Sequence, residues 1–314
     1  MMEFTAKDVN ELRKQTGAGM MACKKALQET DGDMEKAAEY LREQGVAVAA
    51  KKASRIASEG VVSVYTTPDH LVGAMVEVNC ESDFVGKSEV FVELCNNIAK
   101  HVAEKNPSDL EDLLAQKYVG DETMTILDLV NSAIAKIGEK ISIRRFTRIA
   151  QPEGRVEGYT HLGGKLGVLL EVKTGKNVND NEEFATACHD VALHVAWCSA
   201  KYTYNNEVPA EEVAHEKEIL KAQALNDPKN AGKPEAIIEK MLVGKVNKFY
   251  KDVCLIDQDF VKDNSVTVKQ HLTAVAAKAG TTCEIVKFEK FVMGEGLEKK
   301  NENFAEEIAK IANK

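Results

Sequence analysis

The apolar positions near the start of the chain recur every three or four residues, which predicts three short helices within the first fifty residues. Thr5 and Asp8 form a helix-start signal, and Asp33 can cap the third helix. The expected buried stripes are Val9 and Leu12, then Met20, Cys23 and Leu27, then Met34, Ala37, Ala38 and Leu41, with the third helix ending at Gly45. Met20 and Met21 lie about 100° apart on a helical wheel, so we expect unequal burial of the two. A bundle this small favours docking over catalysis.

The body of the chain repeats itself. Residues 59–66 are echoed by residues 153–160, and each copy continues into a strand that contains Glu-Val, at 77–78 and at 171–172. Alternating β-branched residues predict a β-hairpin in each copy, followed by a helix. The matching helix positions are Phe91, Cys95, Ile98, His101, Val102 and Ala103 in the first copy and Phe184, Cys188, Val191, His194, Val195 and Ala196 in the second. A third strand should then follow a glycine, Gly138 or Gly280.

The second copy is longer than the first. The spacing of equivalent positions grows from 94 residues (Gly60 to Gly154) to 142 residues (Gly138 to Gly280), so about 48 residues are inserted. The insert is assigned to residues 207–252, which carry two narrow apolar stripes with charged opposite faces. The stripes are Val213, Leu220 and Ala224, then Ile238, Met241, Leu242 and Phe249. This pattern predicts an antiparallel helical hairpin that projects from the body.

These elements predict an α+β fold in which helices pack on small antiparallel sheets. The expected units are an N-terminal domain at 1–56, a first core subdomain at 57–150, a second at 151–292 with the inserted hairpin at 207–252, and a C-terminal module at 293–314. The module opens with a Gly-Glu-Gly joint at 294–296. Phe304, Ile308, Ile311 and Ala312 then predict a terminal amphipathic helix.

Composition narrows the classes of function. The net charge of −9 argues against an extended nucleic-acid surface, and no apolar run approaches the ~20 residues of a membrane helix. The seven cysteines are scattered and form no Cys-x-x-Cys pair, which predicts neither a zinc site nor a disulfide framework. No secretory signal is visible. We therefore expect a cytoplasmic protein without direct nucleic-acid or membrane binding, and without a metal or a cofactor.

Two turns are candidate functional sites. Asn79 through Val85 follow a strand, and the pair Asp83-Phe84 fits either an exposed acidic and aromatic tip or a helix cap with a core-filling ring. The glycines within residues 161–167 predict a hairpin turn beside His161 and match a phosphate loop only weakly. His189, His194 and Cys188 have poor geometry for shared metal ligation, and the repeat of His194 as His101 favours a packing role. No nucleophile, base and acid converge.

The chain resembles the bacterial elongation factor Ts family over essentially its whole length. The family pattern L-R-x-x-T-G-A-G-M-M-x-C-K-K-A-L is carried by Leu12-Arg13 and Thr16 through Leu27, with Ala22 where an acidic residue is usual. Further matching segments are residues 136–139, 232–234, 238–241 and 294–296. The resemblance implies a ubiquitin-associated-like N-terminal bundle, a duplicated core, a coiled-coil hairpin and a C-terminal module.

The resemblance also implies a function: guanine-nucleotide exchange on elongation factor Tu, which the protein would bind in its GDP-bound and nucleotide-free forms. The implied contact residues are Arg13, Met20 and Met21 in the bundle, Ser82, Asp83, Phe84 and Val85 in a wedge beside the partner's magnesium site, and His161, Gly163 and Gly164 in the second turn. Ser82 replaces a threonine, and Leu162 replaces the first glycine of His-Gly-Gly-Gly.

Two other classes of function compete with this one. A protein-interaction or chaperone-like scaffold would bind partners without regard to nucleotide state. A metabolic enzyme would need a convergent catalytic site, which the sequence lacks. The antiparallel hairpin and the exposed sheet also permit a homodimer.

Overall fold

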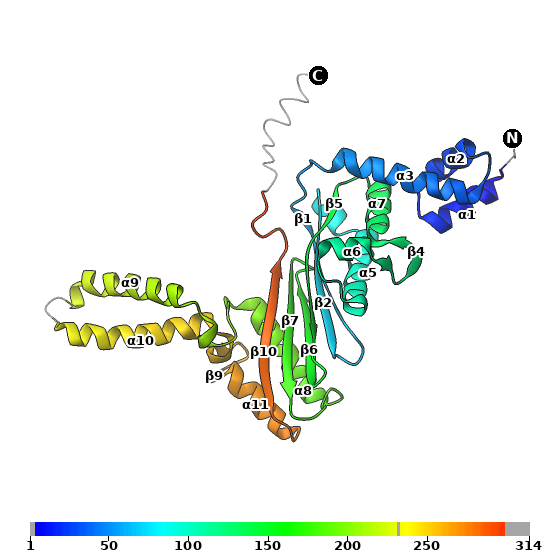
Figure 1. Ribbon diagram of the computed structural model, residues 1–314. Coiled ribbons are helices and arrows are strands. Elements are labelled where there is room, and N and C mark those ends of the chain that lie inside the picture. Colours follow the sequence, from blue (N-terminus) through cyan, green and yellow to red (C-terminus); the bar gives the residue numbers. More distant parts are fainter. Residues whose placement is uncertain (1–3, 231–232, 299–314) are drawn as a thin grey trace.

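The computed structural model describes residues 4–230 and 233–298, and it begins with a three-helix bundle (Figure 1). The bundle consists of α1 (Ala6–Thr16), α2 (Met20–Glu29) and α3 (Met34–Lys52). The predicted start signal is a capping box in which the Thr5 backbone N–H donates to Asp8 Oδ2 at 2.6 Å. Gly17 ends α1 with a φ of 67°, a left-handed conformation that favours glycine.

Two predictions for the bundle were wrong. The third helix does not end at Gly45 but continues to Lys52, because Val48 and Ala49, which follow the glycine, pack against the core of the first subdomain. Met20 is not part of the buried stripe and is 49% exposed. Cys23, with Ala26 and Leu27, fills the bundle core, and Met20 lies in the first turn of α2, beyond that core.

The first core subdomain has a three-stranded antiparallel sheet in the order β1-β2-β5. Its elements are β1 (Glu59–Thr66), β2 (Val72–Cys80), α4 (Asp83–Gly86), α5 (Glu89–Lys105), α6 (Leu110–Ala115), β3 (Lys117–Tyr118), β4 (Asp121–Thr125), α7 (Ile126–Ile137) and β5 (Ile141–Ala150). The predicted hairpin, helix and third strand after Gly138 are confirmed. The small β3–β4 ladder was not predicted.

The second core subdomain repeats this plan with the sheet order β6-β7-β10. Its elements are β6 (Gly154–His161), β7 (Leu166–Thr174), α8 (Glu182–Trp197), α9 (Ala210–Asn226), α10 (Glu235–Val253), β8 (Asp259–Phe260), β9 (Asp263–Thr267), α11 (Val268–Lys278) and β10 (Cys283–Val292), with short 3₁₀ turns at Asn205–Glu207, Pro228–Asn230 and Leu255–Asp257. The repeat extends to single glycines. A Cβ on Gly60 would lie 2.1 Å from Val78 O, and one on Gly154 would lie 2.0 Å from Val172 O.

The two sheets pack face to face, with the helices on their outer sides (Figure 1). The cluster between the sheets is Val62, Met75, Ile149, Val156, Leu169 and Phe291. Glycines permit the close approach, since a Cβ on Gly158 would lie 2.6 Å from Val64 Cγ1 and one on Gly167 would lie 2.5 Å from Val62 Cγ1. The molecule is therefore a helix–sheet–sheet–helix core, which confirms the α+β prediction.

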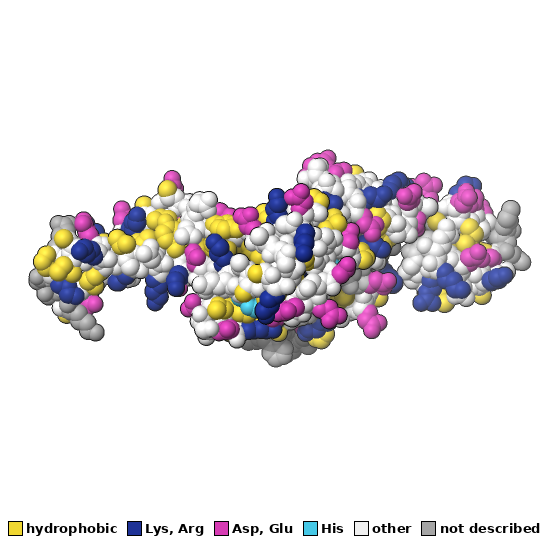
Figure 2. Space-filling view, turned by 90° about the horizontal axis from the view of Figure 1, so that it is seen from below, with side chains coloured by type: hydrophobic (Ala, Val, Ile, Leu, Met, Phe, Trp, Pro, Cys, Tyr) yellow, Lys and Arg dark blue, Asp and Glu magenta, His cyan; other side chains and the backbone are white. Residues whose placement is uncertain are grey.

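The insert forms two antiparallel helices, α9 and α10, that project from the core as predicted (Figure 1). Ala224, Ile238 and Val246 are buried between them, whereas Leu225 and Val243 are exposed. Hydrophobic side chains are visible along this projection in Figure 2. The predicted terminal helix with Phe304, Ile308, Ile311 and Ala312 lies outside the described residues. Among the described helices, none combines the length and the apolar character needed to cross a membrane.

His101 on α5 and His194 on α8 occupy equivalent buried positions. His101 Nε2 lies 3.0 Å from Gln116 Oε1, and His194 Nε2 lies 3.0 Å from Gln258 Oε1. In each copy a backbone N–H, from Val119 or from Val261, donates to Nδ1. An imidazole that accepts at Nδ1 carries its proton on Nε2 and is neutral. The packing role expected for these histidines is therefore supported by two neutral, hydrogen-bonded rings.

Burial lowers the pKa of both histidines, so the folded protein resists their protonation. As the pH falls below the ordinary histidine pKa of about 6.5, the unfolded chain takes up protons that the folded chain does not, and the free energy of unfolding should decrease. Urea denaturation between about pH 7.5 and pH 5 checks this. His194→Gln should reduce the pH dependence, while the exposed control His215→Gln should keep it. Equal slopes for the two variants would contradict the assignment.

Candidate functional site

The first candidate turn follows β2 directly and is held by a residue far along the chain. Ser82 is the N-cap of α4, and its hydroxyl donates to Glu139 Oε1 at 2.6 Å. The backbone N–H groups of Glu81 and Ser82 donate to Glu139 Oε2 at 3.1 and 3.0 Å. Glu81 itself accepts from the Lys140 backbone N–H at 2.6 Å. The turn is therefore fixed by the α7–β5 connection.

This fixed turn presents an aromatic ring to solvent. Phe84 is 82% exposed, so the alternative in which Phe84 fills the local core is wrong. The alternative role of Asp83 as the cap is wrong as well, because Ser82 takes that position and Asp83 begins the helix. Val85 is partly buried against the hydrophobic core of the first subdomain, which anchors the turn. Asp83 pairs with Lys87 at 2.7 Å, and this hydrogen bond lowers the pKa of Asp83. The result is an exposed aromatic ring beside an Asp83–Lys87 ion pair, on a turn that Glu139 holds in place.

The second candidate turn joins β6 to β7, with His161 paired to Leu166. Leu162, Gly163 and Gly164 have φ values of 49°, 65° and 86°, all in the left-handed region. Leu162 therefore takes the conformation that a glycine would adopt more easily, at a cost of about 1–2 kcal/mol. The turn keeps its hairpin geometry despite that replacement, and the side chain of Leu162 is exposed.

The structure brings the two tips together at one end of the sheets. The Val62 backbone N–H donates to Gly164 O at 2.7 Å, and Lys165 Nζ lies 2.7 Å from Glu59 Oε2. The charge of Lys165 also contributes to lowering the pKa of Asp83. The N–H of Met293 donates to Lys165 O at 2.9 Å, so the end of β10 reaches the same place. One surface thus carries both turns and the exit of the C-terminal segment.

Arg13, Met20 and Met21 lie elsewhere, on α1 and α2 of the bundle at the far end of the molecule (Figure 1). Arg13 is exposed, and the Met21 side chain is 75% exposed. The candidate residues therefore form two separate surfaces, one on the bundle and one at the paired tips.

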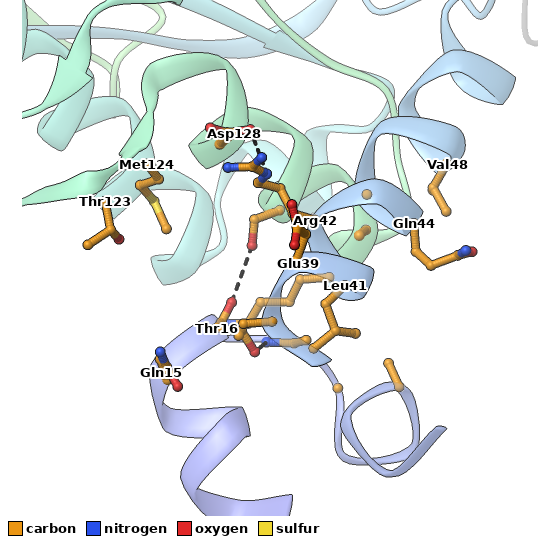
Figure 3. A pocket seen from close by; sticks show the side chains of 18 of the residues that line it. Gln15, Thr16, Glu39, Leu41, Arg42, Gln44, Val48, Thr123, Met124 and Asp128 are labelled. Atoms are coloured by element: carbon orange, nitrogen blue, oxygen red, sulfur yellow. Dashed lines mark hydrogen bonds and ion pairs between the residues drawn. The ribbon is translucent and has the colours of Figure 1, made fainter. Parts of the chain in front are cut away.

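A cavity of about 610 Å³ separates the bundle from the core (Figure 3). Arg42 of α3 reaches toward Asp128 of α7 with a 3.9 Å ion pair, and Ser132 Oγ donates to Thr16 O at 3.4 Å. Further along α3, Gly45 and Val48 lie against the core of the first subdomain. The bundle is thus oriented chiefly by its long third helix.

Sequence reasoning missed the residues that support the first tip, chiefly Glu139, Glu81 and Lys87. A signal existed for Glu139, which belongs to the matching segment 136–139. Its role was not visible because the contact spans 57 residues of sequence. The spacing of apolar residues along the chain carries no information about a hydrogen bond between residues so far apart in sequence.

Comparisons with known proteins agree with one another. A family model described as "Elongation factor TS" matches residues 81–295, and one described as "Elongation factor Ts, mitochondrial, N-terminal" matches residues 1–49. The elongation factor Ts of Trichlorobacter lovleyi is 47% identical over 312 residues, covering 99% of each chain. That of Clostridium novyi is 47% identical over 309 residues (98% of this chain and 99% of the relative), and that of Clostridium perfringens is 46% identical over 311 residues (99% and 100%).

Proposed function

The chain belongs to the elongation factor Ts family, and from that premise we propose that it binds elongation factor Tu–GDP and promotes GDP release. It acts by protein–protein binding and makes or breaks no covalent bond. The observation that carries the proposal is the exposed Phe84 ring on a turn fixed by Glu139. An exposed aromatic side chain on a rigid base is suited to insertion into a partner.

The physical basis of exchange is linkage between two ligands of one protein. A partner that stabilises a nucleotide-poor conformation weakens nucleotide binding, and nucleotide weakens partner binding by the same factor. In this proposal the tip with Asp83 and Phe84 displaces groups that order Mg²⁺ in elongation factor Tu. Loss of Mg²⁺ removes positive charge from the phosphates of GDP, so GDP dissociates faster. Asp83 acts here by displacing protein groups.

The remaining candidate residues would hold the complex together. The bundle offers Arg13, Met20 and Met21 to the partner, and the second tip offers His161 with Gly163 and Gly164. We assign the protein to the cytoplasm, where it would meet elongation factor Tu in the GDP-bound and nucleotide-free forms.

Finer features of the fold belong to the same proposal. Three helices around Leu12, Cys23 and Leu27 support a ubiquitin-associated-like bundle. The buried Ala224 and Ile238 between α9 and α10 support coiled-coil packing of the hairpin.

Release of a fluorescent GDP analogue from elongation factor Tu, chased with excess unlabelled GDP, tests the proposal. A substoichiometric amount of this protein should accelerate release over many turnovers, because each molecule dissociates and acts again. Elongation factor Tu alone, at the same free Mg²⁺ concentration, is the control. Stable binding without acceleration would contradict exchange and favour the scaffold.

A further inference from the structure

Edge strand β6 carries a polar and aromatic stripe on the face that packs against α8. Alternate residues of a strand share one face, so Arg155, Glu157, Tyr159 and His161 lie in a row. Arg155 and Glu157 are buried, whereas Tyr159 and His161 are half-buried. The row therefore leads from the interior of the second subdomain to the second tip.

The contacts along this row are continuous. Arg155 Nε donates to Glu157 Oε2 at 2.9 Å, and Glu157 Oε1 lies 3.2 Å from Nδ1 of His189 on α8. The His189 ring meets Tyr159 edge-on at 5.5 Å. The Tyr159 hydroxyl lies 2.9 Å from His161 Nδ1, and the two rings stack with centroids 5.9 Å apart. An ion pair in the interior is thus connected to an imidazole at the tip.

The first copy of the repeat shows what is special about the second. At the position equivalent to Glu157 and His189, Ser63 Oγ donates to Asn96 Oδ1 at 2.6 Å. Tyr65 stands where the second copy has Tyr159, but residue 67, two positions on, is a threonine. The same strand–helix contact is therefore neutral and ends without an imidazole in one copy. In the other copy it is charged and ends at His161.

The 2.9 Å contact between the Tyr159 hydroxyl and His161 Nδ1 fits a phenol that donates to the ring, since no other acceptor for this hydroxyl is found among the described residues. A phenol that donates to Nδ1 requires a bare Nδ1, so the neutral ring carries its proton on Nε2. Within the described residues, His161 Nε2 makes no hydrogen bond. We propose that Tyr159 is a positioning residue that holds His161 as an Nε2–H donor for a carbonyl or carboxylate oxygen of elongation factor Tu. This inference rests on the proposed function for the identity of the partner.

The first test uses the free protein and needs no partner. Two-bond ¹H–¹⁵N spectra of protein labelled with ¹⁵N-histidine distinguish the two neutral tautomers, and the His161→Gln variant assigns the signals. The parent should show the Nε2–H tautomer at about pH 8, where an ordinary histidine is neutral. Tyr159→Phe should give a mixture of tautomers. Tyr65→Phe, which removes the equivalent hydroxyl from the first copy, should leave His161 unchanged.

The second test measures GDP release with subsaturating amounts of each variant. Tyr159→Phe should slow release about 3- to 10-fold, as expected for one misdirected hydrogen bond, and Tyr65→Phe should match the parent. His189→Asn, which installs the residue of the first copy, should shift both readouts in the same direction. An unchanged His161 tautomer in Tyr159→Phe overturns the inference, and so does a changed tautomer with parental release. Failure of the proposed function is recognised separately, because the parent itself would then not accelerate release.

Discussion

Replacing Phe84 with alanine is expected to slow the stimulated release of GDP about 10- to 100-fold, because the ring can be buried only in the complex and burial of a phenylalanine contributes about 1.5–3 kcal/mol. Folding should be almost unaffected, since the ring is 82% exposed and surface substitutions usually stay within about 0.5 kcal/mol. The fluorescent GDP assay measures the first effect, and urea denaturation measures the second.

Leu127→Ala is the matched control for this prediction. Leu127 is also an exposed apolar residue near the start of a helix, but it lies on α7 outside both candidate surfaces. Its removal should leave GDP release unchanged. If Phe84→Ala and Leu127→Ala released GDP at the same rate as the parent, the tip would have no part in exchange, and the bundle would have to supply the activity.

The largest loss of stability is expected from Glu77→Ala. The carboxylate is completely buried and accepts from Arg144 Nη1 at 3.0 Å, Arg145 Nε at 2.7 Å and the Gly294 backbone N–H at 2.8 Å. Removing it takes the buried carboxylate from the Gly294 N–H and from both arginines, which keep only acceptors at Val292 and Glu295. Breaking a buried ion pair costs about 3–5 kcal/mol. Urea denaturation at pH 7 should show a decrease of that size in the free energy of unfolding.

The second copy supplies the control for Glu77. Glu171 stands at the equivalent position and accepts from Gln151 Nε2 at 2.9 Å. Because its partner is a neutral amide, Glu171→Ala should cost clearly less than Glu77→Ala. Equal losses would show that burial, and not the arginine cluster, sets the effect.

The pH dependence of the Glu77 contribution follows from its pKa. Burial alone would raise this pKa, but the hydrogen bonds from Gly294, Arg144 and Arg145 outweigh burial and lower it. A carboxyl group with a lowered folded pKa stabilises the protein above its unfolded pKa, and this stabilisation is lost as the pH falls toward the folded value. The difference in stability between the parent and Glu77→Ala should therefore shrink in acid.

Local patterns and the internal repeat were sufficient to predict much of this fold. The capping box at Thr5, the two hairpins and the inserted helices all follow from spacing within a short window. The packing role of His101 and His194 was also predicted correctly, because a histidine at the same position in both copies indicates a shared structural role. The β3–β4 and β8–β9 ladders escaped prediction because each pairs a strand of two residues with one of five, which is too short for a clear alternation of apolar and polar positions.

The candidate site required contacts that no local pattern contains. A strand followed by Ser-Asp-Phe suits a buried ring as well as an exposed one. The choice is made by Glu139, which holds the turn so that Val85 packs inward and Phe84 does not. Met20 shows that a local pattern can also predict burial wrongly. Its spacing fits a core stripe, but its place in the first turn of α2 puts it beyond the core.

The long third helix sets both the distance and the rotation between the bundle and the sheets. Its 19 residues span about 28 Å, with the first half in the bundle core and Val48 against the first subdomain. Distance and rotation cannot change separately in such a connecting helix, because each added residue lengthens it by about 1.5 Å and turns its end by about 100°. The angle at which the bundle presents Met21, relative to the direction of Phe84, is therefore encoded in the number of residues in α3, independently of the chemistry at either end.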